Sequence, residues 1–188
     1  MSNVLVGDVW ILAGQSNMEG YGRRAQLEEP NDLVHCFTMA QRWELGGEPL
    51  HWRIESRDPV HLYGRLTDKD EDERRVIRAR RRKERTSGAG LGLTFAKDLV
   101  EHTGVPIGLI PCAHGGPSIG QWDPALKSAG RRSLYGAMVE RVEAVGGRIK
   151  GVLWHQGEAD MDHGSAAQYA ERFRNLIEQV RVDFRQPD

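Results

Sequence analysis

The chain has 188 residues, with 26 lysines and arginines against 27 aspartates and glutamates, so its formal net charge is −1. A chain of this length can bury about 70% of the surface that its unfolded form exposes, which is enough for a full hydrophobic core. The balanced charge argues against a nucleic acid or an anionic membrane as a general partner.

Predicted strands and helices alternate along the chain. Runs 9–13 and 33–37 are apolar and of strand length, without the alternation of a half-exposed strand, so they suit strands that are buried on both faces. The pattern continues as helix 91–102, strand 107–111, helix 133–145, strand 149–154 and helix 166–184. This alternation predicts an α/β fold with a doubly wound, mostly parallel sheet of the flavodoxin-like type.

The segment of about 66–87 departs from this pattern. It is acidic over 68–73 and basic over 74–85, an order that suits the dipole of a helix. We expect a solvated helical excursion, and the alternative is a basic face for an anionic polysaccharide or nucleic acid. Because no repeat or linker divides the chain, we expect one domain over 1–188.

Cysteine usage and hydropathy limit the remaining classes. Cys36 and Cys112 are the only cysteines, too few for a disulfide framework or a thiolate metal site, and we expect both to be buried thiols. No stretch approaches the ~20 apolar residues of a membrane span, and the N-terminus lacks the features of a signal peptide. We therefore expect a soluble protein, either cytoplasmic or secreted with its leader outside this chain.

Polar loops follow three of the predicted strands. They have the sequences GQSNM (14–18), PCAHGGPSIGQW (111–122) and WHQGEAD (154–160). In open α/β sheets, ligands bind beyond the carboxyl ends of the strands. The three loops are therefore predicted to converge on one crevice.

The residue types in these loops suit acyl transfer. Ser16 follows a glycine at a strand end, where it is either a nucleophile or a helix N-cap, although Met18 stands where a G-x-S-x-G elbow has its last glycine. Gly115 and Gly116 let the backbone approach a ligand and aim N–H groups at an oxyanion, or else they form a tight turn. Gln156 can donate its amide to the same oxyanion.

The blocks LAGQSNMEG, GGPSIGQW and WHQGEAD, in this order, resemble the sialate O-acetylesterase-like carbohydrate esterases (the SASA domain) of the SGNH-hydrolase superfamily. The resemblance implies a three-layer α/β/α sandwich and a serine esterase that removes O-acetyl groups from carbohydrates such as sialic acids or xylan. It implies Ser16 as the nucleophile and Gly116 and Gln156 as the oxyanion hole. Gln15, Asn17 and Glu158 would support these groups. An O-acetylated carbohydrate is the expected partner, and acyl transfer at a serine needs no metal or organic cofactor.

The chain departs from the family at its C-terminal end. The family's general base resembles a D-x-x-H block beyond the helix that follows the third loop, and no histidine occurs after Ala166. We expect the C-terminal block to be missing from this sequence, or another histidine to have replaced it, or the protein to be inactive. His114, His155 and His163 lie nearest the predicted crevice, and the role is assigned to none of them.

Two other function classes remain open. A catalytically inactive carbohydrate-binding or scaffolding protein would keep the crevice without the chemistry. A metal site would draw on the side chains that follow the last predicted strand, although their spacing matches no H-E-x-x-H pattern; these are His155, Glu158, Asp160, Asp162 and His163. Trp43 and Trp122 are expected either to stack on a sugar or to pack in the core.

Overall fold

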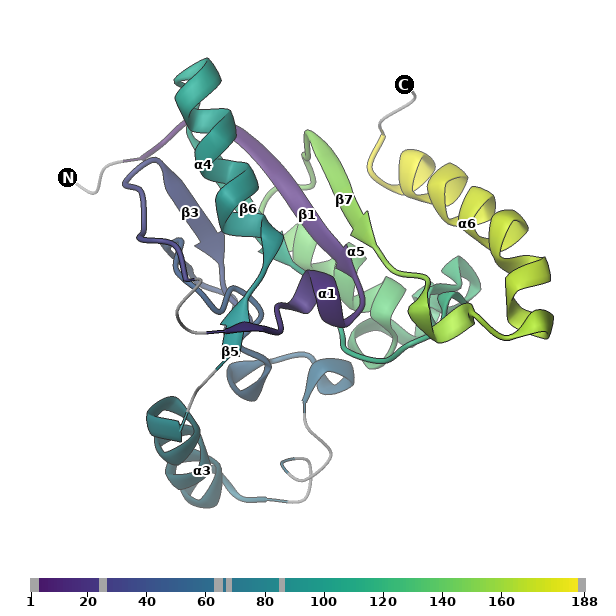
Figure 1. Cartoon of the computed structure of the whole chain (residues 1–188), viewed down its shortest axis with the longest axis horizontal. Helices are drawn as coiled ribbons and strands as arrows, with labels where there is room; N and C mark the ends of the chain where they lie inside the picture. Colours follow the sequence, from purple (N-terminus) through teal and green to yellow (C-terminus); the bar gives the residue numbers. More distant parts are fainter. Residues whose placement is uncertain (1–3, 24–26, 63–65, 67–68, 85–86, 186–188) are drawn as a thin grey trace.

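The computed structural model of the chain describes residues 4–23, 27–62, 66, 69–84 and 87–185. Within these residues, five strands form the central sheet in the order β4-β3-β6-β1-β7 (Figure 1). Only β4 runs antiparallel to its neighbour. A separate antiparallel pair joins β2 and β5. The strands are β1 (Asp8–Gly14), β2 (Gly22–Arg23), β3 (Val34–Phe37), β4 (Trp43–Leu45), β5 (Ser87–Ala89), β6 (Ile107–Pro111) and β7 (Gly151–His155).

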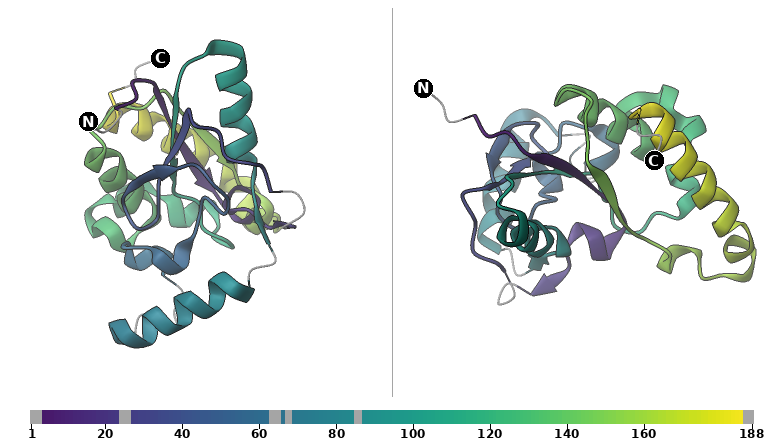
Figure 2. Two further views of the ribbon diagram at one scale, coloured as in Figure 1. Left: turned by 90° about the vertical axis from the view of Figure 1, so that its left-hand side faces the viewer. Right: turned by 90° about the horizontal axis from the view of Figure 1, so that it is seen from above.

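Helices cover both faces of the central sheet, as Figures 1 and 2 show. One face packs against α4, and the other packs against α5 and α6. This confirms the predicted α/β/α sandwich. The α-helices are α1 (Ser16–Glu19), α3 (Glu71–Glu84), α4 (Leu91–Thr103), α5 (Leu134–Ala144) and α6 (His163–Asp183). Short 3₁₀ helices are Arg53–Glu55, Pro59–His61, Ile119–Trp122, Pro124–Arg132 and Glu158–Asp160.

Each face of the sheet has its own hydrophobic core. Successive side chains of a strand point to opposite faces, so Ile11 joins the core beneath α5 and α6 while Leu12 joins the core beneath α4. The neighbouring strand does the same with Ile110 and Leu109. Apolar side chains cover both faces of these strands. This explains why polar and apolar residues do not alternate in the runs 9–13 and 107–111.

Most predicted elements occur within two residues of their expected bounds. The exception is α6, which begins three residues early at His163, while the fourth predicted strand begins two residues late at Gly151. Strand β4 was not predicted: all three of its residues are exposed, so it leaves no apolar run in the sequence. The β2–β5 pair was not predicted either, because its strands are two and three residues long.

The charged segment forms α3, which projects from the rest of the molecule (left view of Figure 2). Its acidic first turn pairs with arginines one and two turns later, as in Arg75 with Asp72 at 3.1 Å and Arg78 with Glu71 at 2.5 Å. Residues 67–68 and 85–86 of the predicted excursion lie outside the described residues. In the part of the chain that the structure covers, no helix is both long enough and apolar enough to cross a bilayer.

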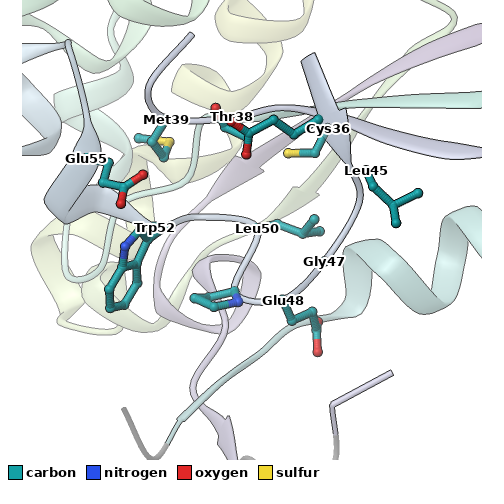
Figure 3. A pocket seen from close by; sticks show the side chains of 11 residues that line it. Cys36, Thr38, Met39, Leu45, Gly47, Glu48, Leu50, Trp52 and Glu55 are labelled. Atoms are coloured by element: carbon teal, nitrogen blue, oxygen red, sulfur yellow. The ribbon is translucent and has the colours of Figure 1, made fainter. Parts of the chain in front are cut away.

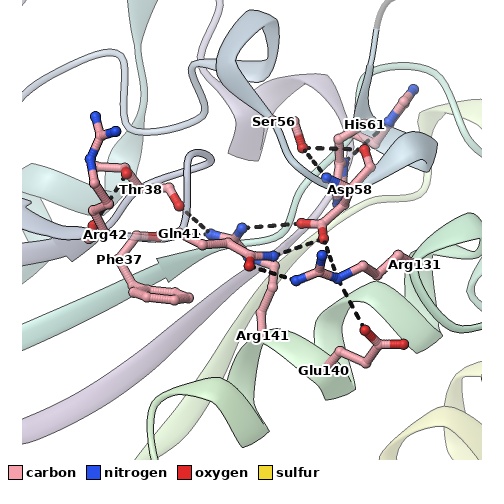
Figure 4. A network of polar contacts seen from close by, with 11 residues as sticks. Phe37, Thr38, Gln41, Arg42, Ser56, Asp58, His61, Arg131, Glu140 and Arg141 are labelled. Carbon is pink, nitrogen blue, oxygen red and sulfur yellow. Dashed lines mark hydrogen bonds and ion pairs between the residues drawn. The ribbon is translucent and has the colours of Figure 1, made fainter. Parts of the chain in front are cut away.

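A buried polar network fixes the long connection between β3 and α3 (Figure 4). Arg141 of α5 and Asp58 are both fully buried, and the guanidinium lies 3.2 Å from the carboxylate. Arg141 also donates to the carbonyls of Phe37 and Thr38, at 2.7 and 3.0 Å. Burial raises the pKa of Asp58, and Arg141 and Arg131 act against this rise. The network thereby ties the connection to the carboxyl end of β3.

Candidate active site

Three loops meet at the carboxyl ends of β1, β6 and β7. The Gln15 N–H donates to the His155 carbonyl at 2.8 Å, and the His114 N–H donates to the Gly14 carbonyl at 3.2 Å. The end of β1 and the loop after it are thus hydrogen-bonded to the end of β7 on one side and to the loop after β6 on the other. The convergence predicted from the sequence is present in the structure.

The close approach of β1 and β7 depends on Gly14. Its φ is +131°, and a Cβ at this position would lie 2.1 Å from the His155 carbonyl oxygen. Gln15, the next residue, has a buried side chain that reaches from the first loop to the third. Its Oε1 accepts hydrogen bonds from the N–H groups of Gly157 and Ala159, at 3.5 and 3.3 Å. Gln15 therefore holds the third loop in place against the first.

Ser16 is the first residue of α1, directly beyond the end of β1. Its residue is half-buried, and its hydroxyl has no hydrogen-bond partner among the residues that the structure describes. As the first residue of the helix, Ser16 also has an N–H group without an intrahelical acceptor. Both a hydroxyl and an N–H group are therefore available at one position.

The two glycines of the second loop differ in what their N–H groups contact. The Gly115 N–H donates to the carboxylate of Glu19 at 2.5 Å. Gly116 has a φ of +97°, is exposed, and has an N–H group without a partner within the described residues. Gly116 thus has the free N–H group that oxyanion binding requires.

Gln156 reaches this region already bonded. Its amide nitrogen donates to the Pro117 carbonyl at 3.2 Å and to the Asp160 carboxylate at 2.5 Å. The same Asp160 oxygen accepts the N–H of Ile119 at 2.8 Å. Asp160 is buried and holds the second and third loops together. The weaker of the two Gln156 bonds, to Pro117, is the one that an oxyanion could replace.

Asn17 and Glu158 form the exposed rim of the site. The Asn17 amide donates to Glu158 Oε1, and the His155 Nε2 atom lies 3.9 Å from the same oxygen. The three side chains come from the first and third loops. This contact places Glu158 beside the residue that follows Ser16.

Histidines next to the glycine loop are held in neutral forms. Arg53 can only donate, so Nε2 of His114, which lies 2.9 Å from it, accepts, and the His114 proton is on Nδ1. Burial, with Arg53 beside it, lowers the pKa of His114 to about 4. His61 stands 3.4 Å from His114 Nδ1, and burial lowers its pKa well below the usual value. His114 therefore has no free nitrogen with which to accept a proton.

The Glu19–Arg53 pair was missed in the sequence. Arg53 lies 3.1 Å from Glu19, and only 7% of each side chain is exposed. The available signal was a charged residue between Met18 and Gly20, in a stretch otherwise made of apolar and small polar residues. Its partner, Arg53, lies 34 residues later in the sequence. Local sequence patterns carry no information about a pairing over that separation.

The structure also bears on two questions that the sequence left open, the role of the tryptophans and the alternative metal site. Trp122 is fully buried and packs edge-on against Trp154, with ring centroids 5.3 Å apart, so it belongs to the core and cannot stack on a sugar. Trp43 is 45% exposed but lies against Gly108 of β6, away from the three loops. The residues of the alternative metal site do not form a cluster of three ligands among the described side chains; the His163 side chain is outside these, and Asp160 points to Gln156 and Ile119 instead.

A cavity of about 410 Å³ opens at the carboxyl end of β3 (Figure 3). The side chains of Trp52, Glu48 and Glu55 surround it, together with apolar groups such as Leu50. None of the three loops contributes to its lining. The cavity is therefore separate from the candidate site around Ser16.

Comparisons with known proteins identify the family of this chain. A family model described as "Carbohydrate esterase, sialic acid-specific acetylesterase" matches residues 6–188. "Probable carbohydrate esterase" of Arabidopsis thaliana is 31% identical over 201 residues. The X-ray structure of this plant protein superposes with a TM-score of 0.70 at 29% identity, over 97% of this chain and 71% of that one. "Sialate O-acetylesterase" of Homo sapiens is 25% identical over 210 residues.

These curated relatives are longer proteins. The plant match covers 95% of this chain and 65% of the relative, and the human match covers 97% of this chain and 36% of the relative. Over residues 6–188, the chain belongs to the carbohydrate esterase family of sialic acid-specific acetylesterases.

Proposed function

We propose that this chain is a serine esterase that removes O-acetyl groups from carbohydrates through an acetyl-serine intermediate. One observation carries the proposal. The Ser16 hydroxyl and the Gly116 N–H lie on adjacent loops and lack partners among the described residues, while the neighbouring polar groups are bonded to one another. A nucleophile and an oxyanion donor are the groups that must stay free for a substrate.

In the first step, the Ser16 oxygen attacks the acetyl carbonyl carbon while a general base takes the serine proton. The carbonyl oxygen becomes negatively charged. The N–H groups of Ser16 and Gly116 stabilise this oxyanion, and the Gln156 amide joins them by giving up its 3.2 Å bond to Pro117. Loss of one such donor raises the barrier by about 3 kcal/mol.

In the second step, the tetrahedral intermediate collapses and the sugar oxygen leaves with a proton from the protonated base. Water then attacks the acetyl-serine carbonyl and passes a proton to the base. The base returns this proton to the Ser16 oxygen as the bond between that oxygen and the acetyl carbon breaks, and acetic acid is released. The substrate class that we propose is an acetyl ester on a sialic acid or on xylan. The family description, which names sialic acid-specific acetylesterases, supports the first of these.

The general base needs a separate experiment, because no histidine among the described residues bonds to the Ser16 hydroxyl and His114 is already engaged by Arg53. We expect added imidazole to increase acetate release by the unmodified protein and not by Ser16→Ala. Imidazole would supply the proton acceptor that the described residues do not place at the serine. A rate that is independent of imidazole would instead assign the base to a residue of the chain, and His155→Ala tests the candidate on the rim.

The main test compares the unmodified protein with Ser16→Ala, with folding matched by circular dichroism. Acetate release is measured from 4-nitrophenyl acetate, from an O-acetylated sialic acid and from acetylated xylan. We expect activity to disappear in the variant. Equal activity in both proteins would reject Ser16 as the nucleophile. No activity in either protein, with or without imidazole, would favour the inactive carbohydrate-binding alternative.

A further inference from the structure

A buried ion pair lies directly behind the glycine loop. Glu19 is on the same helical turn as Ser16, three residues later, and only 7% of its side chain is exposed. One guanidinium nitrogen of Arg53 lies 3.3 and 3.1 Å from the two carboxylate oxygens. The pair therefore brings a neutralised carboxylate, rather than a free negative charge, close to the site.

The carboxylate of Glu19 makes its other bond to the loop itself. Its Oε2 accepts the Gly115 N–H at 2.5 Å. The contact is tight, since a Cβ built at Gly115 would lie 3.0 Å from that oxygen and 3.2 Å from the Tyr21 hydroxyl. Because Gly115 is bonded inward, Gly116 is left as the loop's free N–H donor.

Arg53 holds the preceding residue of the same loop. It donates to His114 Nε2 at 2.9 Å, and its Nε donates to the His61 carbonyl at 2.9 Å. Two consecutive loop residues, His114 and Gly115, are thus bonded to one ion pair. That pair is attached at one end to the turn that carries Ser16.

We propose that Glu19, together with Arg53, is a positioning residue that fixes the glycine loop relative to Ser16, so that the Gly116 N–H meets the oxyanion formed at the serine. This inference rests on the proposed esterase function. The physical reason is that an oxyanion donor contributes only when it is held within a few tenths of an ångström of its place, and a displacement of about 1 Å can lower a rate about 100-fold.

Glu19→Gln tests the proposal with little change of shape. Gln has nearly the same shape as Glu, and Arg53 keeps its bonds to the His61 carbonyl and to His114, so we expect the variant to fold. We expect kcat for the acetyl ester to fall about 100-fold with KM nearly unchanged, because the loop contributes in the transition state rather than in substrate binding. Binding of methylboronic acid, which forms a tetrahedral adduct on a serine, should weaken by a similar factor.

Asp183→Asn is the matched control. Asp183 is also a buried carboxylate, with 8% of its side chain exposed, and it binds Lys127 and Tyr135. Within the described residues, Asp183 contacts none of the three loops. The kcat of Asp183→Asn should therefore stay within about twofold of that of the unmodified protein at a temperature where both are folded. Gly115→Ala is a second variant that leaves the ion pair intact. Its Cβ would push the loop away from Glu19, and we expect the same loss of kcat.

Amide hydrogen exchange at Gly115 separates the two proposals, because it does not depend on activity. We expect the Gly115 N–H to be protected in the unmodified protein and to exchange at least tenfold faster in Glu19→Gln. If the unmodified protein is active and Ser16→Ala is not, an unchanged kcat in Glu19→Gln overturns the positioning role alone. If the unmodified protein has no esterase activity, the proposed function fails, and unchanged exchange at Gly115 would overturn the contact on which the inference rests.

Discussion

Asp160 makes the sharpest stability prediction, because one buried oxygen holds two loops. Its carboxylate is 3% exposed, and Oδ2 accepts both the Ile119 N–H at 2.8 Å and the Gln156 amide at 2.5 Å. The other oxygen, Oδ1, has no hydrogen-bond partner among the described residues. Replacing Asp160 by Ala removes the acceptor of the buried Ile119 N–H and one of the two acceptors of the half-buried Gln156 amide, which keeps its bond to the Pro117 carbonyl.

The expected magnitude follows from these two bonds. A buried donor left without a partner destabilises a protein by about 1–3 kcal/mol, and the half-buried Gln156 amide loses one of its two bonds as well. Asp160→Ala should therefore lower the free energy of unfolding by about 2–4 kcal/mol. Asp160→Asn should lower it by only about 1–2 kcal/mol, because the amide oxygen can take the place of Oδ2 and accept both bonds in their weaker, neutral form.

Urea unfolding followed by circular dichroism at pH 7.5 measures both values. Asp123→Ala is a suitable control, because Asp123 is an exposed cap whose side chain accepts a single N–H group among the described residues, that of Ala125 at 2.9 Å. Its loss should cost about 1 kcal/mol. The reasoning would be refuted if Asp160→Ala lost less than 1 kcal/mol, or if the Asn and Ala variants were equally destabilised.

Three other predictions concern the fold. Gly14→Ala should lose at least about 4 kcal/mol by thermal unfolding, since its Cβ would meet the His155 carbonyl oxygen; a variant within 1 kcal/mol of the unmodified protein would contradict this. Leu109→Ala, in the dry core under α4, should lose about 2–5 kcal/mol of unfolding free energy, and a loss below 1 kcal/mol would show that the site is not packed as described. Burial lowers the pKa of His51 to about 3, so His51 stays neutral in the folded protein while the same imidazole takes up a proton below pH 6.5 in the unfolded chain. The folded state therefore keeps its full stability above pH 6.5 and loses stability relative to the unfolded chain as the pH falls from 6.5 toward 3. Between pH 7.5 and 5.0, His51→Gln should therefore lose about 2 kcal/mol less stability than the unmodified protein, and equal losses would reject the assignment.

The main elements of the fold could be read from the sequence because their burial is periodic. Strand β6 was predicted as residues 107–111, which are its bounds in the structure, since a strand buried on both faces must be apolar at every position. The three polar loops could be placed at one edge because parallel strands have their carboxyl ends together. The strand β4 had no such signal, because its residues are exposed.

The individual contacts of the site could not be predicted in the same way. The sequence indicated a Gly-Gly loop, but only the tertiary structure separates Gly115, whose N–H is bonded to a carboxylate 96 residues away, from Gly116, whose N–H is free. It also places both Gln156 hydrogens on other acceptors. The sequence by itself determined which segments are buried and which residue types gather at the edge of the sheet, because burial and strand direction leave local patterns. The tertiary structure alone decided which polar groups are bonded and which stay free for a substrate, since those partners come from segments that meet only when the chain has folded.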